Sequence, residues 1–280
     1  MKVGITTAFS HPDSDIVAFG RAVEERGFSS IYLPHHTHLP VEEGAPPALV
    51  GGVNIDDYRS IVDPLIALSA MAAQTTALRL GTGVLLVAQL DPIVLAKELA
   101  TLDIISNGRV TLGVGYGWNR REAESHGVDF SKRRTIANEK IACMREIWAN
   151  EPAGYVGKYV EMPQSWSRPK PIQRPSIPIL FGGFPSEKLF STIAGMADGW
   201  IPIGGTGLGA NIPLLKREVE KANRRWSEIQ IVAFGIFPEE PKLEYFRSIG
   251  VTEVVLRVSS GSHNDMLREL DNYSVYASTA

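Results

Sequence analysis

The sequence predicts an α/β fold, a (β/α)8 TIM barrel with an insertion after the fourth strand and its helix. Short apolar runs typical of strands alternate with helical segments along the whole chain of 280 residues, and eight such units can be counted. The runs are apolar throughout, which is typical of parallel strands that are covered on both faces. A doubly wound open sheet is the alternative, but its glycine fingerprint would follow the first strand, which ends here in Thr6-Thr7-Ala8-Phe9.

The predicted elements follow one another in regular order. We expect strands at residues 2–9, 29–33, 78–86, 110–114, 177–181, 199–203, 229–234 and 253–258. We expect helices after them at residues 13–26, 63–76, 92–105, 121–126 with 133–148, 186–197, 212–226, 238–249 and 263–276. Asp13 or Ser14 is placed to cap the first helix and Gly27 to end it, and Pro64 suits a first helical turn.

Two longer segments interrupt this order. Residues 34–58 form a loop with several Gly and Pro residues after the second strand, and we expect this loop to act as a lid. Residues 152–176 form an insertion, with a small hairpin predicted at 155–160. Because the alternation resumes directly after the insertion, residues 1–280 are expected to be a single domain.

The composition argues against several classes of protein. The formal net charge of −3 gives no basic footprint for nucleic acid. No apolar run approaches the roughly 20 residues of a membrane helix, and the chain starts with a strand and not with a signal-peptide pattern. Cys143, the only cysteine, excludes an intrachain disulfide and is expected to be a packed thiol. We therefore expect a cytoplasmic protein that acts on a small molecule and binds neither nucleic acid nor membranes.

The loops at the carboxyl ends of the strands should hold the site, as they do in barrels of this class. After the fourth strand come Gly113, Gly115 and Gly117, which leave room for a flat ring or a polar tail close to the backbone. Trp118 and Asn119 add an aromatic wall and an amide at the same place. The alternative is a glycine-rich strand end that only makes a tight turn.

Two further glycine loops suit a phosphate. Gly182 and Gly183 precede a helix that starts near Ser186, so backbone N–H groups and the helix dipole can meet an anion there. The run Gly204-Gly205-Thr206-Gly207 offers a second such position. Together with the aromatic wall, these loops indicate a phosphorylated planar cofactor, unless the glycines merely end their strands.

Histidines gather after the second strand, at His35, His36 and His38. A zinc site would need ligands that converge from several elements. A metal-dependent barrel hydrolase would also be expected to have carboxylates at the later strand ends, which are glycine-rich or apolar in this chain. We therefore expect no metal. A polar loop is the alternative for the histidines, and His36 is the one that we assign to the pocket.

These strand ends together resemble the bacterial-luciferase-like monooxygenase superfamily, and within it the branch that uses the deazaflavin coenzyme F420. The matching stretches are residues 33–40, 80–84, 99–109, 112–122 and 197–200, so the resemblance covers essentially the whole chain. It implies a (β/α)8 barrel with an insertion. Because dimers are frequent in such proteins, it also implies a homodimer.

The resemblance further implies roles for individual residues. A non-prolyl cis peptide near Gly83 and Val84 would support the cofactor ring, and His36 would lie beside the reactive face of the ring. The expected cofactor contacts are His35, Gly83, Val84, Gly115, Gly117, Asn119, Gly182, Gly183, Phe184, Gly204 and Gly205. His36 and Trp118 are the expected catalytic residues, and Phe9, His38 and Trp166 are expected in the substrate pocket.

Two positions depart from the family pattern. The residue before the motif histidine is commonly acidic, and here it is His35. Trp118 stands where the family's sugar-phosphate and secondary-alcohol dehydrogenases have a proton-transferring glutamate, which argues against those two activities. Glu122 is close in sequence, but it could equally cap a helix.

We therefore expect an oxidoreductase that transfers a hydride between coenzyme F420 and a small organic substrate, with the chemistry between Trp118, His36 and Phe9. An FMN-dependent monooxygenase is the alternative within the superfamily. A cofactor-binding protein without turnover and a metal hydrolase on the same barrel are alternatives of other classes.

Overall fold

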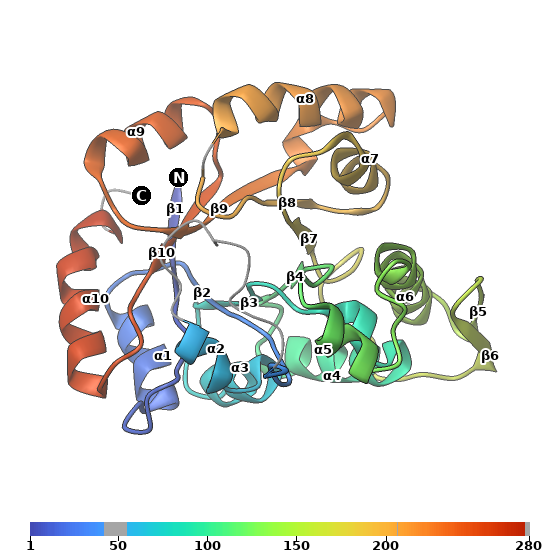
Figure 1. Cartoon of the computed structure of the whole chain (residues 1–280), viewed down its shortest axis with the longest axis horizontal. Helices are drawn as coiled ribbons and strands as arrows, with labels where there is room; N and C mark the ends of the chain where they lie inside the picture. The colour runs from blue at the N-terminus through green and yellow to red at the C-terminus, as the bar shows by residue number, and fades with distance from the viewer. Residues whose placement is uncertain (42–54, 206, 278–280) are drawn as a thin grey trace.

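Eight parallel strands close into a barrel in the computed structural model, which describes residues 1–41, 55–205 and 207–277. The strands are β1 (Lys2–Thr6), β2 (Ser30–Leu33), β3 (Arg79–Thr82), β4 (Val110–Val114), β7 (Ile179–Gly182), β8 (Gly199–Ile201), β9 (Gln230–Ile236) and β10 (Glu253–Arg257). Consecutive barrel strands are neighbours, and β1 pairs with both β2 and β10. The predicted (β/α)8 barrel is therefore confirmed (Figure 1).

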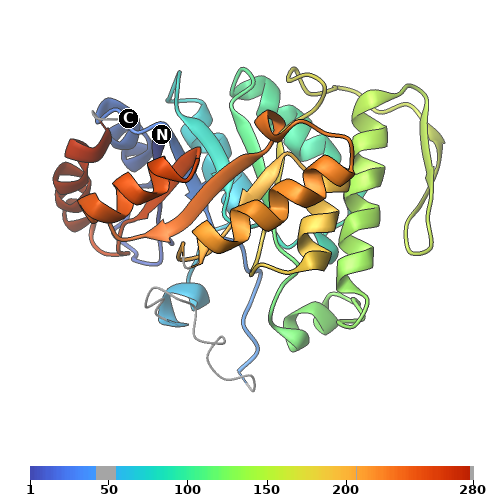
Figure 2. The ribbon, with the colours of Figure 1, turned by 90° about the horizontal axis from the view of Figure 1, so that it is seen from above.

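Helices follow the strands and surround the barrel, as Figure 1 shows. The longer ones are α1 (Ile16–Glu25), α3 (Pro64–Ala72), α4 (Pro92–Ile105), α6 (Arg133–Ala149), α7 (Glu187–Met196), α8 (Leu208–Lys221), α9 (Glu240–Ser248) and α10 (His263–Ala277). Two shorter helices, α2 (Ile55–Arg59) and α5 (Arg120–Ser125), lie at the same end of the barrel in Figure 2. Residues 42–54 of the predicted lid lie outside the described residues, as does Thr206.

Aspartate caps decide where several helices begin. Asp63 accepts a backbone N–H bond from the first turn of α3, and Pro64 takes the first helical position as predicted. Helix α1 begins later than predicted, because its cap is Asp15 and not Asp13 or Ser14. The Asp15 carboxylate accepts the Ala18 N–H at 2.9 Å. Gly27, with φ of +81°, ends this helix as expected.

Strands β1 and β3 are shorter than predicted. The first was expected to reach Phe9, but Phe9 has φ of +51°, a left-handed conformation that strands do not contain. The third was expected to reach Leu86, but its continuous part ends at Thr82. Leu85 forms an isolated parallel bridge with Val114, and a 3-10 turn follows at Val87–Gln89. The run has the apolar composition of a strand because its leucines, Leu85 and Leu86, are buried in the fold.

The barrel interior is packed with side chains. Tyr32, Leu180, Ile201, Val232 and Val255 form a buried cluster there. This packing fills the space below the carboxyl ends of the strands, so a ligand site has to lie above it, in the mouth.

The insertion forms the predicted hairpin, which lies on the outer side of α6 (Figure 2). Strands β5 (Ala153–Val156) and β6 (Glu161–Ser165) pair antiparallel as a separate sheet. The Glu139 carboxylate of α6 accepts the backbone N–H groups of Tyr159 and Val160 at 2.7 and 3.2 Å. These bonds hold the hairpin against the barrel helices.

Two further sequence expectations concern the environment of the protein. Cys143 is buried as expected, and burial raises the pKa of its thiol to about 11. Within residues 1–41, 55–205 and 207–277, none of the helices combines the length and the apolar character that crossing a bilayer requires.

A buried arginine holds the amino-terminal side of the barrel together. The Arg109 guanidinium donates to the backbone carbonyl oxygens of Ala72, Thr75 and Leu78 at 3.0, 2.9 and 2.6 Å. These carbonyl groups lie between the end of α3 and the start of β3, so one side chain links this segment to β4.

Replacing Arg109 with Met should lower the free energy of unfolding by about 3–5 kcal/mol, because the buried carbonyl oxygens lose a charged donor. Urea denaturation followed by circular dichroism measures this change. Arg21→Met is the control, since Arg21 is exposed and pairs with Glu25 at 3.8 Å, and it should change stability by less than about 1 kcal/mol. Equal losses in the two variants would contradict the role of Arg109.

Candidate functional site

A cavity of about 420 Å³ opens at the carboxyl ends of the barrel strands. The loop or end of each of the eight barrel strands contributes at least one wall residue. Its volume lies in the range of roughly 300–1,000 Å³ that is usual for small-molecule sites. The predicted site residues that line it are His35, His36, Gly83, Val84, Gly115, Gly117, Trp118, Gly182, Gly183 and Phe184.

The floor of the cavity is built around Val84. The peptide bond between Gly83 and Val84 is cis, as the family resemblance implied. A Cβ atom on Gly115 or Gly182 would come within 2.4 or 2.7 Å of the Val84 side chain. The packing of Val84 therefore requires glycine at both positions. The sequence analysis explained these glycines by close approach of a cofactor.

The glycine loop after β7 has an open backbone. Gly183 has φ of +148°, a conformation that favours glycine, and its nearest neighbour beyond the adjacent residues is a Leu189 methyl group, 3.5 Å from an added Cβ. Ser186 caps α7 by accepting the Leu189 N–H. The loop from Gly182 to Ser186 therefore meets the first turn of a helix at the cavity wall, where an anion is stabilised.

Two arginines from the start of α6 line the same cavity. The Arg134 guanidinium lies 4.7 Å from the centre of the Tyr116 ring, and that ring packs against Phe181 of β7 at 5.4 Å. Arg133 donates to the Gly117 carbonyl at 3.1 Å. Basic residues are unfavourable in a first helical turn, where the helix dipole is positive. Two arginines at the start of a helix therefore indicate an anion site. The sequence analysis did not use this pattern.

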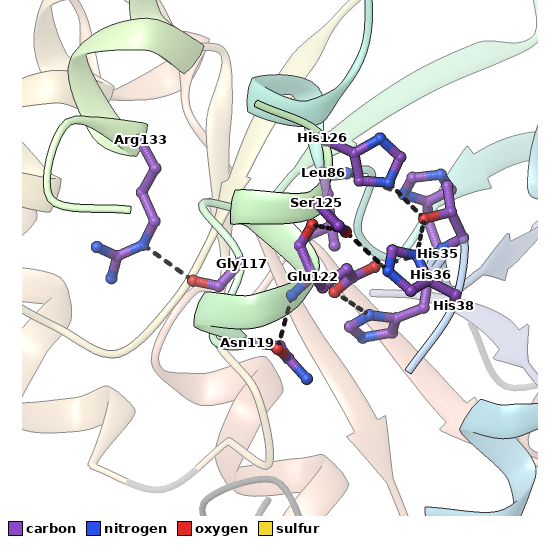
Figure 3. A network of polar contacts seen from close by, with 11 residues as sticks. His35, His36, His38, Leu86, Gly117, Asn119, Glu122, Ser125, His126 and Arg133 are labelled. Atoms are coloured by element: carbon purple, nitrogen blue, oxygen red, sulfur yellow. Dashed lines mark hydrogen bonds and ion pairs between the residues drawn. The ribbon is translucent and has the colours of Figure 1, made fainter. Parts of the chain in front are cut away.

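His36 lines the cavity and forms a buried pair with Glu122, and Figure 3 shows the polar contacts around the two residues. His36 Nδ1 lies 2.8 Å from a Glu122 carboxylate oxygen, and the two side chains are 6% and 0% exposed. The other carboxylate oxygen accepts the Thr37 N–H at 3.3 Å. A carboxylate that binds one imidazole nitrogen fixes the orientation of the ring and leaves the other nitrogen, Nε2, available.

Glu122 is not a capping residue, although it stands at the third position of α5. The cap is Asn119, whose side-chain oxygen accepts the Glu122 N–H at 2.9 Å. Because Asn119 begins the helix, the Glu122 side chain is free to point toward His36. Glu122 is thus the carboxylate that binds His36. The sequence analysis mentioned Glu122 but gave it no role in the site.

His35, the residue before His36, is buried and has a different environment. Its Nδ1 accepts the backbone N–H of Leu86 at 3.3 Å. Burial lowers the pKa of His35 to about 4, so the ring is neutral near pH 7 and can accept this bond.

Several predicted contacts do not reach the described cavity wall. Asn119 caps α5 and does not line the cavity, so its predicted cofactor contact stays a prediction. Phe9 was expected in the substrate pocket, but it is buried against Phe19 with ring centres 5.3 Å apart. Trp166 follows the hairpin and is 83% exposed, because the insertion packs outside α6 and not over the mouth.

His38 and the predicted glycines after β8, Gly204 and Gly205, also lie outside the described cavity wall. His38 is exposed and bonds to Ser125 and Thr37 at 2.8 and 2.9 Å. A Cβ atom on Gly205 would come within 2.5 Å of Phe246 in α9. Gly205 therefore allows close packing of α9, and neither it nor Gly204 belongs to the described wall of the cavity.

The cavity also contains residues that sequence reasoning missed. Tyr58 and Asp57 come from the short helix α2, and Arg257 comes from the end of β10.

No cluster of three or more His, Cys, Asp or Glu side chains in the described part of the chain is arranged to hold a metal ion.

Known proteins share both the sequence pattern and the fold. Residues 1–238 match the family model described as luciferase-like monooxygenase. An uncharacterized protein of Mycobacterium tuberculosis is 41% identical over 268 residues, which are 95% of this chain and 94% of that protein. An F420-dependent glucose-6-phosphate dehydrogenase of Amycolatopsis mediterranei is 28% identical over 240 residues, 82% of this chain and 66% of that enzyme. The solved structure of monooxygenase RslO1 from Streptomyces bottropensis has a TM-score of 0.80 at 18% identity, with 98% of each chain covered. This chain therefore belongs to the luciferase-like monooxygenase family.

Proposed function

We propose that the protein is an oxidoreductase that binds coenzyme F420 in the barrel mouth and transfers a hydride between it and a small organic substrate. One observation carries the proposal: a single cavity is lined by the glycine loop at Gly183, by two arginines of α6 and by His36, which is held by buried Glu122. The F420-dependent relative supports the choice of cofactor, because its similarity spans 82% of this chain.

The residues of the cavity fit a flat, phosphorylated cofactor. The ring would lie over Val84. The phosphate would lie at the loop from Gly183 to Ser186, where the absence of a Cβ and the first turn of α7 leave room for its oxygens. Arg134, which lines the same cavity, would offset the negative charge of the phosphate.

His36 is the residue that we assign to proton transfer. When bound, the deazaflavin supplies the hydride chemistry, and the protein orients the substrate and excludes water. Because Glu122 holds Nδ1, the nitrogen of His36 left for the substrate is Nε2. We infer that Nε2 donates a proton to a substrate oxygen or accepts one from it, and that Glu122 is a positioning residue.

Two aromatic residues enclose His36. Tyr58 and Trp118 approach its ring nearly edge-on, with ring centres 5.1 and 5.7 Å away. Burial raises the pKa of the Tyr58 hydroxyl, so this group stays neutral near pH 7. Both rings line the cavity and would keep water away from the reacting atoms.

FMN-dependent monooxygenation is the second candidate, because the matching family model describes monooxygenases. The substrates of sugar-phosphate and secondary-alcohol dehydrogenases are not part of the proposal. Trp118 stands where the resemblance places the proton-transferring glutamate of those enzymes. A homodimer stays a prediction.

Side-by-side binding tests the cofactor. Purified protein should bind F420 tightly and FMN weakly, with binding followed by quenching of cofactor fluorescence. Preference for FMN would favour oxygen-dependent monooxygenation. If neither cofactor binds, the cofactor assignment is wrong and only the barrel remains.

Replacing Gly183 with Val should abolish cofactor binding, because a branched side chain would strain a backbone at φ of +148° and fill the phosphate position. The same fluorescence titration measures it. Gly195→Val in α7 is the matched control, since a Cβ there meets nothing within 4 Å. Unchanged affinity of the Gly183 variant would contradict the phosphate-loop assignment.

Replacing Glu122 with Gln should leave cofactor affinity within about twofold of the wild type and slow single-turnover hydride transfer by roughly 100-fold. The reason is that His36 loses the carboxylate that orients it. Stopped-flow absorbance of the cofactor measures the rate with any substrate found by screening. Glu124→Gln, on the exposed side of the same helix, is the control. Equal rates for the wild type and the Glu122 variant would remove the pair from the mechanism.

A further inference from the structure

A second position for an anion lies in the mouth, away from the glycine loop. Arg257 stands at the end of β10 and lines the cavity with a side chain that is 17% exposed. In the barrel, β8 and β9 separate β10 from β7, which carries the glycine loop. A cofactor phosphate bound at Gly183 would therefore lie away from Arg257, and Arg257 could bind an anionic group of a second ligand.

The chain places one of its own carboxylates at this position. The Ser10 hydroxyl donates to one Asp57 carboxylate oxygen at 2.7 Å, and the other oxygen lies 3.8 Å from the Arg257 guanidinium. Ser260 supports this arrangement, because its hydroxyl oxygen lies 2.7 Å from that of Ser10 and accepts the Ser10 N–H at 2.8 Å.

The donors and the carboxylate come from different parts of the fold. Ser10 follows β1, and Arg257 and Ser260 belong to the end of β10 and its loop, so the donors are borne by the barrel. Asp57 belongs to the five-residue helix α2. A pair of hydroxyl and guanidinium donors around a carboxylate is the usual arrangement for binding a carboxylate or a phosphate.

The charges of the wall favour an anionic ligand in addition to the cofactor. Arg133, Arg134 and Arg257 line the cavity, and Asp57 is the single carboxylate among its described wall residues. A concave site with an excess of one charge attracts ligands of the opposite charge. Tyr58, the residue after Asp57, contacts the His36 ring at 5.1 Å, so this position adjoins the proton-transferring residue.

We propose that the substrate of the F420-dependent reaction carries an anionic group, a carboxylate or a phosphate. This group binds Arg257 together with Ser260, which both line the cavity, and takes the place of Asp57. The reacting atom of the substrate then lies beside His36. This inference rests on the proposed function, because it names the class of substrate for the same site.

Calorimetric titration of the full-length protein with phenylacetate, phenyl phosphate and the neutral phenylacetamide tests the proposal. At least one of the two anions should bind, and the amide should not. Arg257→Met should weaken anion binding by at least about tenfold, because a charged donor is lost. Asp57→Asn should tighten it by about fivefold, because the competing carboxylate is gone. The anion that binds more tightly identifies the group on the substrate.

Matched variants separate this position from its surroundings. Asp56→Asn changes the same charge on the same helix, and Arg120→Met removes the same charge at an exposed position that does not line the cavity. Both should leave anion affinity unchanged. Equal affinity in the wild type and Arg257→Met would overturn the proposal. So would weaker binding in Asp57→Asn, which would mean that the ion pair only fastens α2 to the barrel.

The cofactor assignment is tested independently of this site. Arg257→Met should bind F420 with wild-type affinity, and loss of that binding would place Arg257 in the cofactor site and overturn the proposal. Because the anion titrations contain no cofactor, Arg257-dependent anion binding in a protein that binds neither F420 nor FMN would contradict the cofactor assignment and not the anion site.

Discussion

The pairing of β1 with β10 closes the sheet, and the site depends on this closure. Five residue pairs join the two strands, from Lys2 opposite Glu253 to Thr6 opposite Arg257. Closure turns the carboxyl ends of all eight strands toward one mouth. It also allows the Ser10 N–H to bond to Ser260 across 250 positions of sequence. In an open sheet these residues would lie at opposite edges, and no cavity would form between them.

The mouth is organised by contacts between neighbouring loops. The bond between His36 and Glu122 joins the loop after β2 to α5, which follows β4. Because Asn119 decides where α5 begins, it also decides where the Glu122 carboxylate points. A helix cap thus controls the orientation of a histidine ring that stands more than 80 positions earlier in the chain. This explains how a residue with no place in the cavity wall can still matter to its chemistry.

Glycines around the mouth serve different physical purposes that look alike in the sequence. Gly115 and Gly182 make space for the Val84 side chain, and Gly205 makes space for Phe246. Gly183 is different, because its φ of +148° and its open surroundings leave the backbone exposed to the cavity. Among these glycines, only Gly183 fits the explanation that the sequence suggests for all of them, which is close approach of a ligand to the main chain.

The barrel, the boundaries of β4 and α4, and the hairpin in the insertion could all be predicted from the sequence. These features follow from local periodicity, capping residues and turns, which a few neighbouring residues specify. Local patterns also led to errors, since the buried run after Thr82 has the composition of a continuous strand but keeps only an isolated bridge to β4, at Leu85.

Which loop residues meet in the mouth depends on tertiary contacts. Asn119 and Phe9 were expected there, but a helix cap and an aromatic contact hold them elsewhere. Glu122 and Arg257 come to the site through the start of α5 and the closure of the barrel. The direction of a side chain in a loop depends on contacts with residues distant in sequence, and no local pattern contains those contacts.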